Sequence, residues 1–288
     1  MTFPKAKLVT TLVCFCFSPI LLMSCQKTEH DDYYEVSQVQ TAMEESNDVS
    51  ELQGLADQGD SEAQYNLGDM YFYGEGVPQD YDKAVQWFEK STNQGNPDAP
   101  FRLGHMYSGS LGVPQDYDKA VQWYEKAANQ GNSDAELRLG FMYLKGEGVP
   151  QDYDKVVQWF EKAANQGDAI AQFNLGDMYL KGERVPQDYD RAVQWFEKAA
   201  DQEGSGAQFN LGVMYFNGEG VPQDYATAAR WIEKAANQEH VGAQYNMGMI
   251  YYNGKGVRQD YATAQEWFGK ACDNGEQKGC DGYKDLNQ

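Results

Sequence analysis

The hydrophobic positions along the chain predict two amphipathic helices joined by a tight turn. The first, helix A, is predicted from apolar residues at spacings of 0, 4, 7 and 8, as in Ala171, Leu175, Met178 and Tyr179. The second, helix B, has a broader apolar stripe at spacings of 0, 3, 4, 7 and 8, as in Ala192, Trp195, Phe196, Ala199 and Ala200. Glycines and a proline between them, as in residues 74–81, end helix A, and Asp80 is placed to cap helix B. The pattern therefore predicts a helix-turn-helix unit.

This unit recurs every 36 residues. The period is set by the six tryptophans of the chain, Trp87, Trp123, Trp159, Trp195, Trp231 and Trp267. A strict period of this length is typical of an array in which each unit stacks on its neighbours. The sequence predicts an all-α array of six repeats at about residues 60–95, 96–131, 132–167, 168–203, 204–239 and 240–275, with a terminal capping helix in 276–288.

A glycine recurs inside each helix A, although glycine within a helix costs about 1 kcal/mol relative to alanine. These glycines are Gly68, Gly104, Gly140, Gly176, Gly212 and Gly248. We expect each to leave room for Trp and the following aromatic residue of helix B, because a bulky side chain packs well against a neighbour that lacks one. The tryptophans are therefore interpreted as core residues and not as a cofactor site.

The repeated motifs resemble those of the Sel1-like repeat family, a relative of the tetratricopeptide repeat. The shared motifs are Ala-x-x-x-Leu-Gly-x-Met-Tyr, Gly-x-Gly-Val-Pro-x-Asp-Tyr-x-x-Ala and Trp-Phe-x-Lys-Ala-Ala-x-Gln-Gly, from about Asp60 to the C-terminus. The resemblance implies a right-handed α-solenoid over residues 51–288 whose concave surface binds other proteins. It implies a role in assembling complexes more than a reaction.

In tetratricopeptide-like arrays helix A lines the inner surface, so the resemblance places partner binding on residues of helix A outside its core stripe. The candidate positions are Asn66, Arg102, Arg138, Asn174, Asn210 and Asn246 and, in a second column, Asp69, His105, Phe141, Asp177, Val213 and Met249. The second column changes in charge, size and polarity while the flanking core residues barely change. Such variation is expected of a recognition surface, and an unconstrained solvent face would show it too.

The N-terminus predicts export. Lys5 and Lys7 precede an apolar run over residues 8–22, which is too short to span a bilayer comfortably and is followed by a lipobox-like Leu-Met-Ser-Cys. The pattern resembles bacterial lipoproteins, in which residues 1–24 would be removed and Cys25 lipidated. Gln26 in place of an aspartate then favours the outer membrane, facing the periplasm or the cell surface. The polar segment 25–50 is interpreted as a flexible acidic tether.

Two cysteines remain near the C-terminus, Cys272 at the end of the last helix B and Cys280 early in the capping helix. The seven residues between them contain two glycines, so antiparallel helices could bring the thiols together. A disulfide that staples the end of the array is one interpretation, and two free buried thiols are the other. The local sequence also resembles the cysteine-rich, secreted branch of the same family.

The net charge of −21 argues against binding to nucleic acid or to anionic lipid, so membrane contact is expected only through the lipid anchor. The acidity fits a protein partner with a basic patch, and it fits equally a charge that serves solubility.

Nothing in the chain has the spacing of a catalytic, metal or phosphate-binding motif, so no cofactor is predicted. We therefore expect a non-catalytic scaffold in the cell envelope. The alternative is a binder of cell-wall peptides or β-lactams with weak hydrolase activity, described for cysteine-rich relatives and supported by no residue here. An immunity-type or purely structural role is the third hypothesis.

Overall fold

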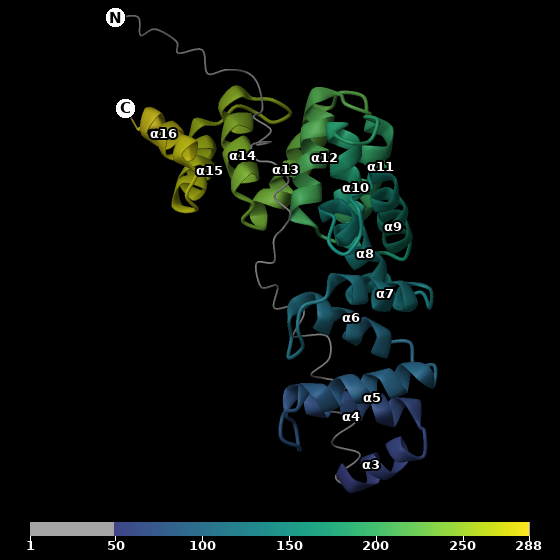
Figure 1. Cartoon of the computed structure of the whole chain (residues 1–288). Coiled ribbons are helices and arrows are strands. Elements are labelled where there is room, and N and C mark those ends of the chain that lie inside the picture. Colours follow the sequence, from purple (N-terminus) through teal and green to yellow (C-terminus); the bar gives the residue numbers. More distant parts are fainter. Residues whose placement is uncertain (1–48, 288) are drawn as a thin grey trace, which may run out of the picture. The chain divides into compact units, whose positions relative to one another are not determined.

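The computed structural model describes residues 49–287, which are helical apart from short turns and links (Figure 1). The predictions for the signal peptide, for lipidation of Cys25 and for the tether lie outside the described residues, except for the last two residues of the tether. The described chain forms two compact units, here called the N-terminal unit (residues 49–168) and the C-terminal unit (residues 169–287).

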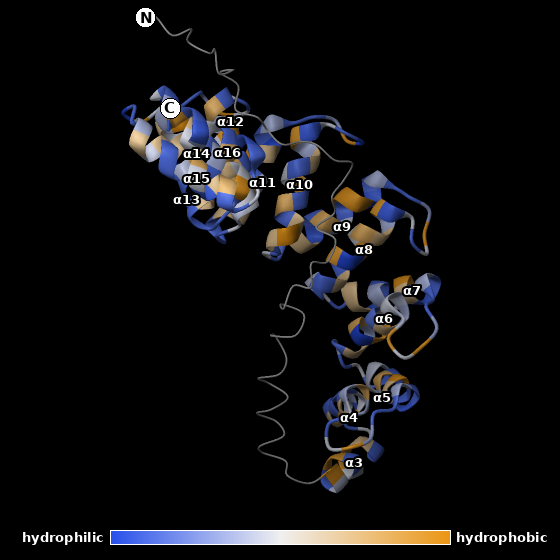
Figure 2. Ribbon diagram, turned by 90° about the vertical axis from the view of Figure 1, so that its left-hand side faces the viewer, coloured by the Kyte–Doolittle hydropathy of each residue, from blue (hydrophilic) through white to orange (hydrophobic). Residues whose placement is uncertain are grey.

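The N-terminal unit contains seven helices, and each packs on the next in sequence. They are α3 (Val49–Asp57), α4 (Ser61–Tyr73), α5 (Tyr81–Asn93), α6 (Ala99–Gly109), α7 (Tyr117–Ala128), α8 (Ser133–Lys145) and α9 (Tyr153–Asn165). Helices α4, α6 and α8 are the predicted A helices, and α5, α7 and α9 are the predicted B helices. Each helix carries hydrophobic and hydrophilic residues together, as an amphipathic stack requires (Figure 2).

The C-terminal unit repeats this arrangement with seven further helices. They are α10 (Ala169–Lys181), α11 (Tyr189–Asp201), α12 (Ser205–Asn217), α13 (Tyr225–Asn237), α14 (Val241–Asn253), α15 (Tyr261–Asp273) and α16 (Gln277–Leu286). Here α10, α12 and α14 are A helices and α11, α13 and α15 are B helices. Each unit is therefore an α-solenoid of stacked helix pairs, as the sequence predicted; handedness remains a prediction.

The N-terminal unit begins with half a repeat, and the C-terminal unit finishes with one. Ala56 of α3 lies one period before Thr92 of α5, so α3 takes the place of a helix B before the first complete repeat. Gly279 of α16 lies one period after Ala243 of α14, so α16 takes the place of a helix A after the last one. The capping helix α16 was predicted, whereas α3 was not.

The glycine inside helix A is a notch for a ring of helix B. A Cβ atom on Gly140 would lie 2.4 Å from the ring of Phe160, which is fully buried. The equivalent notches receive the residue after each tryptophan, namely Phe88, Tyr124, Phe196, Ile232 and Phe268. The prediction that the glycine makes room for a bulky side chain of helix B is therefore confirmed for the residue after each tryptophan.

The prediction that all six tryptophans belong to the core needs correction. Trp87 and Trp267 are 8% exposed, but the other four are only half-buried. Each indole ring is instead covered by the lysine three residues later, with the Lys90 ammonium 3.6 Å from the Trp87 ring centroid. The notch is occupied by the next residue, so the tryptophan is left at the edge of the stripe. Met178, predicted to be core, is likewise half-buried.

In α12 and α14, a glutamine in the first turn of helix A connects three consecutive helices. Gln208 of α12 donates a hydrogen bond to the carbonyl of Ala200 in α11 at 3.3 Å and accepts one from Gln238 after α13 at 2.9 Å. Gln244 makes the same pair of bonds, to Ala236 and from Asn274. These polar rungs satisfy buried amides and fix the register of successive repeats.

Candidate partner-binding surface

The candidate positions lie on one face of the A helices, here called the helix-A face, and the structure divides them by accessibility. Eight are half-buried and so reach the surface: Asn66, Arg102, His105, Arg138, Phe141, Asn174, Asp177 and Asn210. The other four are buried: Asp69 (1% exposed), Val213 (4%), Asn246 (1%) and Met249 (7%). The expectation that these four lie outside the core is wrong, while a role in partner binding stays a prediction.

The four are buried because each A helix also packs against its neighbours in the array. Val213 of α12 belongs to the same hydrophobic cluster as Met247 and Ile250 of α14. Met249 of α14 belongs to a cluster that Leu286 of α16 packs against. A residue outside the stripe that faces helix B is therefore still enclosed where the next A helix comes close.

In the N-terminal unit the structure brings two candidates together as an ion pair. Arg102 Nε of α6 lies 3.4 Å from Asp69 Oδ1 of α4 and donates a hydrogen bond to the Tyr65 hydroxyl at 3.2 Å. Tyr73 presents its ring to the same guanidinium at 5.9 Å and is 45% exposed. Tyr65 was not among the predicted site residues. Its spacing of four and eight residues from Asp69 and Tyr73 was the available signal.

This cluster has an excess of acid. Burial raises the pKa of the Asp69 carboxyl above its ordinary value, and the nearby Tyr65 hydroxyl opposes that change. The nearby carboxylates Glu75, Asp98 and Glu62 raise the pKa further. Burial also lowers the pKa of Arg102 to about 10, so the guanidinium stays charged at neutral pH. The Asp69–Arg102 pair thus lies in the field of three further carboxylates.

The rest of the helix-A face in the N-terminal unit is aromatic and basic. The His105 ring stacks on Phe101 at a centroid distance of 6.4 Å. Phe141 meets the buried ring of Phe160 edge to face at 5.1 Å, so only part of it is accessible. Arg138 is half-buried one period after Arg102.

The helix-A face of the C-terminal unit carries fewer charges. Asp177 is paired with Lys181 on its own helix at 2.7 Å. Asn174 donates to the carbonyl of Ile170 at 2.7 Å, and Asn210 is half-buried one period later. This face therefore offers mainly amides beside one internally compensated ion pair.

Within residues 49–287 there is no cluster of three or more metal-ligating side chains, and no helix is long and apolar enough to cross a membrane.

The Sel1 repeat matches six consecutive segments of the chain, at residues 61–96, 97–132, 133–168, 169–203, 205–240 and 241–276. The chain belongs to the Sel1 repeat family. Sel1 repeat proteins typically mediate protein–protein interactions, and the family is generally a non-catalytic scaffold. The Cys272–Cys280 disulfide, one of two interpretations of the sequence, is present.

Solved Sel1 repeat structures are similar to this chain. A protective antigen of uropathogenic Escherichia coli with an SLR fold is 36% identical, with a TM-score of 0.76, over 79% of this chain and 49% of that one. A Sel1 repeat protein of Oxalobacter formigenes is 36% identical, with a TM-score of 0.66, over 82% of this chain and 68% of that one. This chain thus spans about half the length of the Escherichia coli antigen. Among curated proteins no match is found.

Proposed function

We propose that this Sel1 repeat protein is a non-catalytic adaptor of the bacterial cell envelope that binds a protein partner on its helix-A face. The observation that carries the proposal is the half-buried part of that face. In the second column its accessible side chains, His105, Phe141 and Asp177, differ from repeat to repeat, while the notch glycines recur in all six. Residues needed only for packing would be of the same kind in every repeat, as the core residues are.

Affinity capture tests this proposal. The tagged full-length protein would be compared with a variant in which Arg138→Glu and Asp177→Arg reverse one charge in each unit. Gln158→Glu with Gln194→Arg is a matched control, because both glutamines are exposed on B helices. We expect one protein to be captured by the wild type and by the control and lost with the helix-A variant. Capture that is equal for all three would contradict the proposal.

The acidic cluster supports a basic group of the partner at the N-terminal end of the face. Three carboxyl groups besides Asp69 act near a single arginine, so an additional cation would be stabilised there. The affinity should then fall as salt rises, because exposed charge pairs are screened. Surface plasmon resonance at 50 and 500 mM salt would measure this, and an affinity that does not change with salt would count against a basic partner.

Anchoring through Cys25 in the outer membrane is part of the proposal and is supported by the lipobox-like sequence alone. Metabolic labelling with a palmitate analogue should mark the wild type and leave Cys25→Ser unlabelled. Separation of the two membranes by density would then locate the protein. An unlabelled wild type would show that this part of the proposal is wrong.

A further inference from the structure

Helix α16 is attached to its unit differently from the A helices that precede it. It buries one residue, Gly279, whereas α12 buries seven residues and α14 buries eight. Gly279 and Gly282 let the backbone of α16 lie against α15, since a Cβ on either would come within about 3 Å of it. Tyr283 on the same helix is 41% exposed. So little apolar burial gives α16 a weak noncovalent hold.

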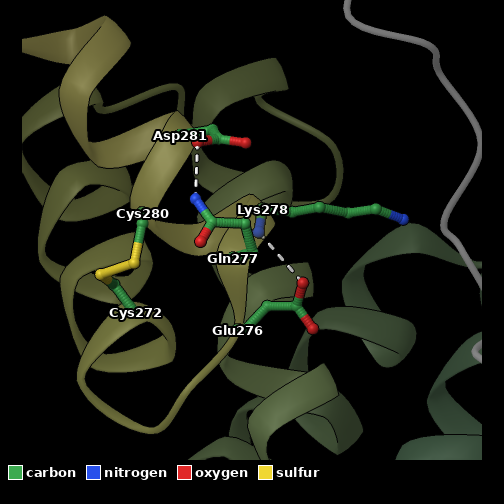
Figure 3. Close-up of a disulfide and its surroundings, with 6 residues drawn as sticks. All are labelled: Cys272, Glu276, Gln277, Lys278, Cys280 and Asp281. Atoms are coloured by element: carbon green, nitrogen blue, oxygen red, sulfur yellow. Dashed lines mark hydrogen bonds between the residues drawn. A yellow bond between two sulfur atoms is a disulfide. The ribbon is translucent and has the colours of Figure 1, made fainter.

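The disulfide takes the place of the noncovalent rung used elsewhere. Cys272 and Cys280 occupy the positions that Ala236 and Gln244 occupy one repeat earlier, where the glutamine amide binds the alanine carbonyl. Figure 3 shows the two sulfurs joining α15 to α16. Both cysteines are only half-buried, so the bridge is within reach of a reductant.

Beneath α16 lies part of the helix-A face of the last repeat. Leu286 of α16 packs against a cluster that includes Tyr245 and Met249 of α14 and Phe268 of α15. Met249, one of the candidate partner-binding residues, is 7% exposed in this packing. α16 therefore covers an apolar end of the helix-A face.

We propose that α16 is a cover held by the disulfide, and that reduction releases it and opens the end of the helix-A face to a helix of the protein partner. That a protein partner binds the opened face rests on the proposed function. The helix that fits carries small residues three positions apart, as Gly279 and Gly282 do over Phe268, and an apolar residue in the place of Leu286.

The reductant is a protein dithiol, and the step is a thiol–disulfide exchange. One thiolate of the dithiol attacks one sulfur of the bridge, forming a mixed disulfide and releasing the other cysteine, which takes up a proton. The second thiol of the reductant loses its proton and attacks the mixed disulfide, and the remaining cysteine takes up a proton. Two electrons thus pass to Cys272 and Cys280, and the dithiol leaves as a disulfide.

Hydrogen exchange on the full-length protein, oxidised and then reduced with a phosphine, tests the cover. Reduction should speed the exchange of residues 277–286 by at least about tenfold and also raise that of residues 245–249. The Cys272→Ala, Cys280→Ala variant should exchange rapidly without reductant. In the matched control, Cys272→Ala with Cys280→Gln, the rung of the previous repeat is restored, and we expect α16 to stay protected in either condition.

Protection of residues 277–286 that survives both reduction and the double alanine substitution would overturn the proposal, because α16 would then be held without the bridge. The partner is tested separately by affinity capture in the two redox states, where we expect stronger capture after reduction. Equal capture in both states would overturn the opening of the face and leave the proposed function standing. No capture in either state would count against the proposed function, and the exchange result would still decide whether α16 is a cover.

Discussion

At the scale of single residues, packing against helix B outweighs helix propensity inside helix A. Gly140→Ala would add a methyl group 2.4 Å from the Phe160 ring, and we expect it to lower the free energy of unfolding by about 1–3 kcal/mol. Gly54→Ala in α3 is the control, because no atom lies within 4 Å of the added group. Removing a helical glycine there should stabilise the protein by up to about 1 kcal/mol. Urea unfolding followed by circular dichroism measures the change in unfolding free energy for both variants. Changes of the same sign would contradict the claim that Gly140 makes room for Phe160.

One helix cap depends on a histidine. His240 Nδ1 accepts a hydrogen bond from the Ala243 amide at 3.1 Å at the start of α14, and its ring stacks on Phe209. Burial lowers the pKa of His240, so folding favours the neutral imidazole. The stabilisation is therefore fully present above the unfolded pKa of about 6.5 and is lost as the pH falls from there through the lower pKa of the folded state.

The His240→Asn variant should remove this pH dependence, because asparagine caps a helix in any protonation state. Between pH 7.5 and 5 we expect the wild type to lose about 1 kcal/mol more stability than the variant, the usual value of a cap. Thermal unfolding at a series of pH values measures the difference. Parallel curves for the two proteins would show that the cap does not titrate.

At this scale the sequence predicted part of the core. The notch glycines could be predicted because a costly residue recurs at a fixed place in each helix. Which ring fills the notch could not, since Trp195 and Phe196 lie side by side on one broad stripe. The burial of Val213 and Asn246 was also beyond prediction, because it depends on how closely neighbouring A helices approach.

At the scale of whole helices, the links between repeats show where the sequence departs from its own pattern. The link before helix A contains a residue with positive φ, which is Gly131 (φ 89°) after α7 but Glu239 (φ 62°) after α13. Only glycine adopts this conformation without strain. Glu239→Gly should therefore stabilise the protein by about 1 kcal/mol, and Gly131→Ala should destabilise it by a similar amount. Calorimetry of the two variants checks both signs, and a loss of stability in Glu239→Gly would contradict the argument.

The two terminal half-repeats differ in how well the sequence predicted them. α16 follows the last helix B and carries Cys280, and both features indicated a capping helix. α3 has neither the tryptophan nor the Tyr-x-x-Ala motif that marks a helix B, so only the final Ala-x-Gln-Gly, at residues 56–59, remains of the repeat pattern. Its place became evident only from its packing on α4.

At the scale of the molecule, the two units should unfold separately, because stability in a repeat array is a sum of local terms. Each repeat has one tryptophan, so six variants that each keep a single tryptophan, with phenylalanine at the other five sites, report on single repeats. We expect Trp87, Trp123 and Trp159 to share one urea midpoint and Trp195, Trp231 and Trp267 to share another. Fluorescence titrations give the midpoints, and one common midpoint for all six would contradict two units.

The fold was predictable at this scale and the site was not, for one reason. The signal for the helices is repeated six times, so a departure in one copy, such as Arg184 with its positive φ, does not obscure it. A binding surface is carried by the positions that do not repeat. In the second column His105 and Phe141 each occur once, so there is no second copy against which to compare them.

The polar rungs also bear on how this protein can change in length. The last two complete repeats carry both halves of the connection: Gln208 and Gln244 each donate a hydrogen bond to the previous helix B and accept one from the amide that follows the next helix B. Removing residues 205–240 would bring Gln244 to the carbonyl that Gln208 now binds, with the same chemistry at the new junction. In this part of the array the protein could therefore become shorter or longer by a whole repeat and keep the same contacts at the new junction.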